Sequence, residues 1–345
     1  MNSTRLETRQ LETTRATGRL TLRPYRGEAD HEAMADALNA HRIAHGMAER
    51  ATAASIGAAY RNLTNCDPHR DVAILEAGGH AVGYGRVYWE DRNSGERCFE
   101  LIENHDPRFV GRQDLAAVLA WQEGRAASTL AGMTGVGERP VIMAAYTLGG
   151  DPHWEAVLLD AGFRLARRHA EMQRDDLTIL PEIPLPDGLR IRPIDPADLA
   201  MIRRVFEADA EVFRDHWGGV DASEAAFTRF REEPSFDPRL WRVAFDGDEI
   251  AGQILNWIDP PEPDGSRRGW TESIAVRRPW RRRGLARALL AASLRAVRDA
   301  GATVATLGVD QENANQALTL YESLGFRVTA EELEFHKPGR LGTAR

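Results

Sequence analysis

The chain has 345 residues, which exceeds one typical domain and fits two. Its hydrophobic content of 43% is enough for ordinary cores, and its net charge of −8 at pH 7 argues against general nucleic-acid binding. No apolar stretch approaches the roughly 20 residues of a membrane span, and residues 1–19 lack the apolar segment of a secretory signal. We therefore expect a cytoplasmic protein with no nucleic-acid or membrane partner.

The first half of the chain alternates between patterns typical of strands and of helices. Ala77-Gly78-Gly79 is a turn signal that joins two of the strands. We predict strands at residues 20–24, 71–75, 82–89, 99–102 and 141–146, and helices at residues 31–40, 51–63, 115–127 and 153–159.

The second half repeats this order. Asp195, followed by Pro196, predicts the N-cap of a helix that runs to about Phe213. Asp246-Gly247 predicts a hairpin. The further predicted elements are strands at residues 189–193, 240–245, 250–258 and 269–276 and a helix at residues 222–232.

Matching segments in the two halves indicate a duplicated domain. Leu22-Arg23-Pro24 corresponds to Ile191-Arg192-Pro193, and Asp160-Ala161-Gly162-Phe163 corresponds to Ser323-Leu324-Gly325-Phe326. A proline-rich segment between the copies predicts an extended linker. The predicted organisation is a tail at 1–19, a domain at 20–179, a linker at 180–188, a domain at 189–338 and a tail at 339–345.

The most informative stretch is residues 271–326. The apolar run Ile274-Ala275-Val276 predicts a strand, and an arginine-rich loop with Gly284 leads into apolar residues at helical spacing. A strand that enters a helix through such a loop presents unpaired backbone N–H groups and a positive dipole end, which suit a phosphate or pyrophosphate. At Gly284 no Cβ obstructs the approach of such a ligand.

This stretch resembles the acetyl-CoA site of the GNAT N-acetyltransferase superfamily. The family's signature [Gln/Arg]-x-x-Gly-x-[Gly/Ala] is met by Arg281, Gly284 and Ala286, and a second block comprises Asn313, Ala317, Leu320-Tyr321 and Gly325-Phe326. The resemblance implies an α/β (α+β) protein with two tandem GNAT folds, each a mixed central sheet flanked by helices. It also implies an N-acetyltransferase with acetyl-CoA as co-substrate, which moves the acetyl group directly to an amine.

The resemblance implies a set of cofactor-binding residues. The splayed strand at Val276 would form hydrogen bonds with the pantetheine amides, and the arginine loop would hold the pyrophosphate. Asn313 would contact the pantetheine arm or an ordered water. Asn313 is equally suited to cap the following helix, and the arginine cluster to form a solvated basic turn. The complete set is Ile274, Ala275, Val276, Arg281, Arg282, Arg283, Gly284, Leu285, Ala286, Asn313 and Ala317.

Two residues are candidates for proton transfer. Tyr321 stands where the family has its general acid, and a phenol with a pKa near 10 stays protonated at neutral pH; the alternative is a packing tyrosine beside Phe326. Glu272 is the candidate general base, on the same strand face as Ile274 and Val276 or their shared edge. Its alternative is a solvent-facing carboxylate, and Trp270 occupies another position that relatives use for the base.

The acceptor site is predicted at the loop with Asp215, His216 and Trp217, where the alternative is a core tryptophan beside a surface histidine. The acceptor is expected to be a small-molecule amine or a peptide N-terminus, and the protein a monomer or homodimer. The histidines show no metal-ligand spacing. The two cysteines suit a reducing cytoplasm and indicate neither a disulfide framework nor a metal site, so no metal is predicted.

The first copy differs from the second where chemistry would occur. Our alignment places Arg112 or Gln113 at the position of Gly284, adds Asp114 near the expected pyrophosphate, and places Leu158 at the position of Tyr321. We therefore predict a degenerate first domain and one working site in the second. This organisation is similar to that of mycothiol synthase and its relatives. The alternative function is a non-catalytic acyl-CoA-binding regulatory module, against which the presence of Tyr321 weighs.

Overall fold

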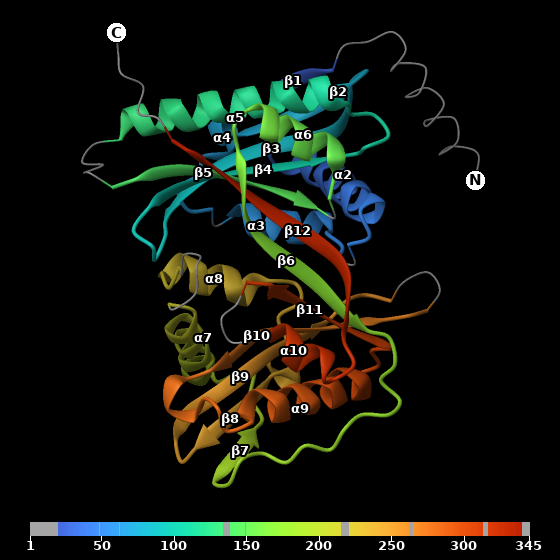
Figure 1. Cartoon of the computed structure of the whole chain (residues 1–345), viewed down its shortest axis with the longest axis vertical. Coiled ribbons are helices and arrows are strands. Elements are labelled where there is room, and N and C mark those ends of the chain that lie inside the picture. The colour runs from blue at the N-terminus through green and yellow to red at the C-terminus, as the bar shows by residue number, and fades with distance from the viewer. Residues whose placement is uncertain are drawn as a thin grey trace. The chain divides into compact units, whose positions relative to one another are not determined.

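The computed structural model describes residues 20–47, 49–61, 63–133, 139–148, 150–214, 221–261, 265–312 and 317–339. The chain forms two compact units (Figure 1). Unit 1 ends at Arg168 and resumes at Ala330, and unit 2 spans His169–Thr329. Each unit is a mixed sheet with helices on both faces, which confirms the predicted α/β class.

The sheet of unit 1 has the strand order β1-β2-β3-β4-β5-β12. Of these neighbours, β4 and β5 are parallel, and β12 pairs antiparallel with β5 through Glu332–Pro338. The strands are β1 (Thr21–Pro24), β2 (Val72–Ala77), β3 (His80–Asp91), β4 (Arg97–His105), β5 (Val141–Leu148) and β12 (Arg327–Pro338).

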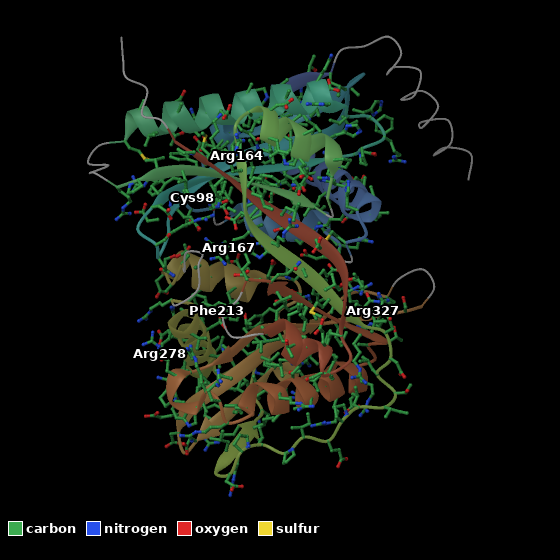
Figure 2. All side chains as sticks on the ribbon, viewed as in Figure 1. Cys98, Arg164, Arg167, Phe213, Arg278 and Arg327 are labelled. Atoms are coloured by element: carbon green, nitrogen blue, oxygen red, sulfur yellow. The ribbon has the colours of Figure 1, made fainter. Side chains whose placement is uncertain are left out.

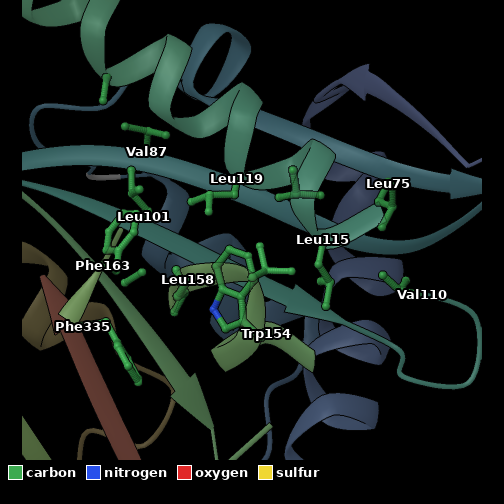
Figure 3. Packing of buried hydrophobic residues seen from close by; sticks show 14 of the residues in the cluster. Leu75, Val87, Leu101, Val110, Leu115, Leu119, Trp154, Leu158, Phe163 and Phe335 are labelled. Atoms are coloured by element: carbon green, nitrogen blue, oxygen red, sulfur yellow. The ribbon is translucent and has the colours of Figure 1, made fainter. Parts of the chain in front are cut away.

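Two hydrophobic clusters cover the two faces of this sheet. The larger joins the sheet to α5 and α6, and Figure 3 shows Trp154 and Leu158 of α6 packed beneath Leu115 and Leu119 of α5. The smaller cluster packs α2 and α3 on the other face. The helices are α2 (His31–Ala44), α3 (Ala53–Arg61), α4 (Pro68–Asp71), α5 (Arg112–Gly132) and α6 (Pro152–Asp160).

The sheet of unit 2 has the equivalent order β7-β8-β9-β10-β11-β6. Its parallel pair is β10 and β11, and β6 pairs antiparallel with β11. One cluster packs α9 and α10 on one face, and another packs α7 and α8 on the other. The strands are β6 (Arg164–Arg174), β7 (Leu189–Arg192), β8 (Arg242–Asp246), β9 (Glu249–Ile258), β10 (Arg268–Val276) and β11 (Val304–Asp310), and the helices are α7 (Leu199–Phe213), α8 (Glu224–Glu232), α9 (Leu285–Asp299) and α10 (Ala317–Glu322).

Each unit takes its last strand from the opposite half of the sequence. Leu333 and Phe335 of β12 belong to the core of unit 1, whereas Ala170 and Met172 of β6 belong to that of unit 2. The predicted linker at 180–188 lies within unit 2, where its apolar side chains pack against the core. The units thus differ from the ranges 20–179 and 189–338 by an exchange of one strand.

Most predicted elements are present, with helix starts shifted by two or three residues. The turn at Asp246-Gly247 joins β8 and β9 as predicted. However, α7 begins at Leu199, not next to Asp195, because the Asp198 carboxylate accepts a hydrogen bond from the Met201 N–H at 2.9 Å and caps the helix. Among the described residues, no helix is both long enough and apolar enough to cross a membrane.

Candidate functional site

The two parallel strands of unit 2 diverge at their carboxyl ends. Pairing between β10 and β11 runs from Arg268 to Trp270 on β10, and β10 then continues beside β9 alone. The β9–β10 register shifts between Glu272 and Ala275, and Ser273 adopts a φ of 49°. The prediction that Glu272, Ile274 and Val276 share one face assumed regular strand alternation. The bulge interrupts that alternation between Glu272 and Ala275. Beyond Trp270, the described part of β11 offers β10 no ladder partner, so the edge of β10 at 274–276 can bond a ligand.

Two glycines that motif analysis did not single out shape this strand. A Cβ on Gly252 of β9 would lie 2.8 Å from the Ala275 carbonyl oxygen, so a side chain there would displace the bulged strand. A Cβ on Gly269 of β10 would lie 2.6 Å from Cβ of Val297 in α9. Glycine at these positions allows the bulge and the close packing of α9 against β10.

The arginine loop ends at the N-terminus of α9, as the sequence predicts. A 3-10 helix at Arg278–Trp280 follows β10, and Arg282 and Gly284 then take left-handed φ values of 64° and 83°. A Cβ on Gly284 would meet no described protein atom within 4 Å, so glycine is favoured there by the backbone conformation and the space remains open. The first N–H groups of α9 have no acceptor within the helix, so an anion can accept from them.

A cavity of about 230 Å³ adjoins this loop. Figure 2 labels two residues in this part of unit 2: Phe213, the last residue of α7, and Arg278, in the 3-10 helix. The Arg277 guanidinium pairs with the Glu211 carboxylate at 2.9 Å, and Arg281 donates from Nε to the Val276 carbonyl at 2.9 Å. These contacts hold two of the arginines at the cavity. It is lined by Glu211, Val212, Arg214, Arg277, Arg278 and Arg281.

The predicted acid and base both lie near the divergence of β10 and β11. The Glu272 carboxylate accepts a hydrogen bond from the Gly308 N–H of β11 at 2.6 Å and is half-buried. Tyr321 of α10 is 6% exposed, and its ring contacts that of Phe326. Burial raises the pKa of the Tyr321 phenol well above 10, and the nearby negative charge of Glu272 raises it further. Tyr321 therefore has the packing role and also keeps its proton.

Asp209 is a third ionisable group near this strand, and the sequence analysis missed it. Its Oδ1 accepts a hydrogen bond from Nε2 of Gln253 at 3.3 Å. Burial raises the pKa of Asp209 to about 7, although hydrogen bonds from Gln253 and from Ser273, in the bulge, act to lower it. A carboxyl group with a pKa near neutrality is suited to general-base chemistry. No sequence signal marks it, because its environment arises from contacts between α7, β9 and β10.

The other predicted site residues have different outcomes. Asp215, His216, Trp217 and Asn313 lie outside the described residues, and Ala317 is the first residue of α10. Trp270 stacks on Trp257 with ring centroids 5.8 Å apart, and its Nε1 donates to Asp259. It is 5% exposed and thus has a packing role.

Unit 1 has the equivalent strands and helices, but different residues stand at the positions of the candidate site. Gly111 is the N-cap of α5, so the structure aligns Gly111, and not Arg112 or Gln113, with Gly284. The Gly111 N–H donates to the Asp114 carboxylate at 3.0 Å, so a protein anion already occupies this helix end. Leu158 does match Tyr321: its carbonyl accepts from the Phe163 N–H at 3.0 Å, as that of Tyr321 accepts from Phe326 at 3.2 Å.

Comparison with known proteins agrees with this arrangement. The Acetyltransferase (GNAT) family profile matches residues 202–326. A mycothiol acetyltransferase of Salinispora tropica is 34% identical over 188 residues, which cover 53% of this chain and 59% of the relative. A mycothiol acetyltransferase of Thermobispora bispora is 31% identical over 264 residues, covering 73% of this chain and 79% of the relative.

A solved structure extends the similarity to both units. The GCN5-related N-acetyltransferase from Sphaerobacter thermophilus is 25% identical, with a TM-score of 0.70, and the match covers 94% of this chain and 98% of that one. The chain belongs to the GNAT acetyltransferase family.

Proposed function

We propose that unit 2 binds acetyl-CoA and transfers its acetyl group to the amine of a small molecule, with unit 1 having no acetyl-CoA site. The observation that carries this proposal is the divergence of β10 and β11. Beyond that point β10 continues through the bulge at Ser273 and enters the arginine loop. Backbone groups of Ile274, Ala275 and Val276 would bond the pantetheine arm. The N-terminus of α9, from Arg281 to Ala286, would hold the pyrophosphate.

The fit of acetyl-CoA rests on charge and shape. The loop combines a left-handed glycine, open space where a side chain would otherwise stand, and arginine side chains at an adjoining cavity. Arginine pairs well with phosphate groups, and helix N-terminal N–H groups donate hydrogen bonds to anions without a preference for the rest of the molecule. Membership of the GNAT acetyltransferase family indicates that the transferred acyl group is acetyl.

The reaction forms a bond from the amine nitrogen to the acetyl carbon and breaks the carbon–sulfur bond. The amine loses one proton and the leaving sulfur gains one, so the protein needs one base and one acid. Tyr321 retains its proton and would supply it to the sulfur. Glu272 would accept the amine proton, directly or through water, and Asp209 is the second candidate for this role.

Relatives named mycothiol acetyltransferase make mycothiol-related amines the first acceptors to test. Asp215, His216 and Trp217 remain our candidates for contacts with the acceptor. A peptide N-terminus belongs in the same screen.

Steady-state kinetics with acetyl-CoA and the best amine test the proposal. Tyr321→Phe should lower kcat about 100-fold with little change in the KM for acetyl-CoA, because the ring still packs but no longer donates a proton. Tyr60→Phe in unit 1 is the matched control, since the buried Tyr60 hydroxyl has no hydrogen-bond partner among the described residues. Equal turnover by wild type and Tyr321→Phe would remove Tyr321 from the mechanism.

The two candidate bases separate in a pH profile. If Glu272 is the base, Glu272→Gln lowers kcat across the whole profile and Asp209→Asn leaves its shape unchanged. If Asp209 is the base, Asp209→Asn removes an acid limb centred near pH 7, the value to which its pKa is raised. We expect the first result, because Glu272 bonds to Gly308 at the point where the strands diverge.

A further inference from the structure

We propose that unit 1 contains a zinc site formed by His41, His105 and Asp151. The histidine spacing in the sequence predicts no metal site, yet the structure brings one nitrogen or oxygen atom from each residue within 4.8 Å of the others. His41 lies in α2, His105 is the last residue of β4, and Asp151 is the N-cap of α6. Residues this far apart in sequence give no local motif.

The distances suit ligands of a single ion. Oδ2 of Asp151 lies 3.5 Å from Nε2 of His41 and 3.7 Å from Nε2 of His105. Zinc ligands at about 2.0–2.1 Å from a tetrahedral ion stand roughly 3.3 Å apart, so small side-chain movements would complete the geometry. The centroids of the two imidazole rings are 4.4 Å apart.

Burial makes this cluster difficult to explain as an ordinary polar network. His41 is 1% exposed, and His105 and Asp151 are each 2% exposed. Among the described residues, neither ring nitrogen of His41 nor Oδ2 of Asp151 has a hydrogen-bond partner. Buried polar atoms are usually bonded, and a cation that binds the Asp151 oxygen and a His41 nitrogen would satisfy both.

The surrounding contacts orient two ligands. Nδ1 of His105 lies 2.9 Å from Oε1 of Glu103, and the tautomer that donates to Glu103 has its lone pair on Nε2, toward Asp151. A carboxylate behind a metal-binding histidine is a common arrangement in zinc proteins. Oδ1 of Asp151 accepts from the N–H groups of His153 and Trp154, which leaves Oδ2 directed at the cluster.

The ligand set suits zinc. Two imidazoles and one carboxylate are typical zinc donors, and three protein ligands leave a fourth coordination position open. Binding would tie α2, β4 and α6 together at the end of unit 1 where β4 and β5 diverge. The expected consequence is greater stability of unit 1, since a ligand that binds only the folded state stabilises it.

The test is calorimetric titration of the metal-free full-length protein with ZnCl2, together with thermal unfolding. We expect one zinc ion per chain and a rise in Tm of about 5 °C in excess zinc. Asp151→Asn and His41→Gln should each weaken binding at least tenfold and lose the shift in Tm. Asparagine can still cap α6, and His153→Gln, which removes an exposed histidine from the same helix, should behave as wild type.

A spectroscopic measurement on the wild-type protein keeps the proposal testable if a variant does not fold. X-ray absorption of the zinc-loaded chain should show imidazole nitrogens and a carboxylate oxygen at about 2.0–2.1 Å. The proposal is overturned if the wild type binds no zinc, if Asp151→Asn and His41→Gln bind it as tightly as wild type, or if the absorption spectrum shows sulfur or only oxygen ligands.

Discussion

The two units share a sheet order but use the divergence of their parallel strands differently. In unit 2, β10 carries a bulge at Ser273 and leads to a helix whose N-terminus is open to an anion. In unit 1, β4 pairs with β3 without a register shift from Arg97 to His105, and Asp114 bonds at the start of α5. The same fold thus has a helix N-terminus open to an anion in one unit and a buried polar cluster in the other.

The register identifies the residues that make this difference. His105 pairs with Gly83 in unit 1 as Val276 pairs with Gly252 in unit 2, so His105 occupies the position of Val276, whose backbone we propose to bind the pantetheine arm. Both glycines are needed for the same reason: a Cβ would lie 2.9 Å from the Asn104 carbonyl oxygen or 2.8 Å from that of Ala275. The duplicated scaffold is retained, and different side chains stand at its equivalent positions.

The largest expected effect concerns the exchanged strands. Phe335 of β12 is 1% exposed in the core of unit 1, and Met172 of β6 is 0% exposed in that of unit 2. Phe335→Ala should lower the free energy of unfolding of unit 1 by about 3–5 kcal/mol, and Met172→Ala should lower that of unit 2 by about 2–5 kcal/mol. Hydrogen exchange resolved by segment measures both. Faster exchange mainly in β8–β10 after Phe335→Ala would contradict the assignment of β12 to unit 1.

The next largest effect is on acetyl-CoA binding by substitutions at the N-termini of α9 and α5. Gly284→Glu should weaken acetyl-CoA binding more than about 100-fold, because it strains a left-handed residue and places a carboxylate beside the pyrophosphate. Gly284→Ala carries the strain without the charge and should lose less. Gly111→Glu, at the start of α5, should bind acetyl-CoA as wild type does; a comparable loss there would mean that unit 1 also binds it.

A smaller effect concerns the stability of unit 2 as a function of pH. The pKa of Asp209 is raised to about 7, so folding favours its protonated form and stability falls as the pH rises from about 4 through 7. Asp209→Asn removes this penalty. We expect the variant to be about 2 kcal/mol more stable than wild type at pH 8, after allowance for partial exposure, and nearly equal at pH 4, close to the pKa of the unfolded carboxyl. Urea unfolding at the two pH values measures this; equal differences at both would exclude a raised pKa.

The smallest expected effect is the difference in acetyl-CoA affinity between arginine substitutions in the two loops. Arg281→Ala should weaken acetyl-CoA binding about three- to tenfold, because it removes one cation near the phosphates and the bond to the Val276 carbonyl. Arg112→Ala, which removes an arginine paired with Asp160 in unit 1, should have no effect. Equal losses in the two variants, measured by fluorescence competition, would indicate a general charge effect and not a local contact.

The sequence predicted what depends on local patterns and missed what depends on distant contacts. The arginine loop and Gly284 were identifiable because motif spacing places them on one strand–loop–helix unit, and Tyr321 because a second motif block places it on the following helix, α10. Strands β6 and β12 were not predicted, because each pairs with a strand from the other half of the sequence. Asp209 and the His41–His105–Asp151 cluster were missed for the same reason: burial and convergence across elements give these residues their character.

We propose that acetyl-CoA binds at one site per chain, in unit 2. Calorimetric titration of the full-length protein with acetyl-CoA tests it most directly, through the stoichiometry of wild type and of Gly284→Glu. We expect one site in the wild type and none in the variant. Two sites in the wild type, or one site that survives Gly284→Glu, would contradict it.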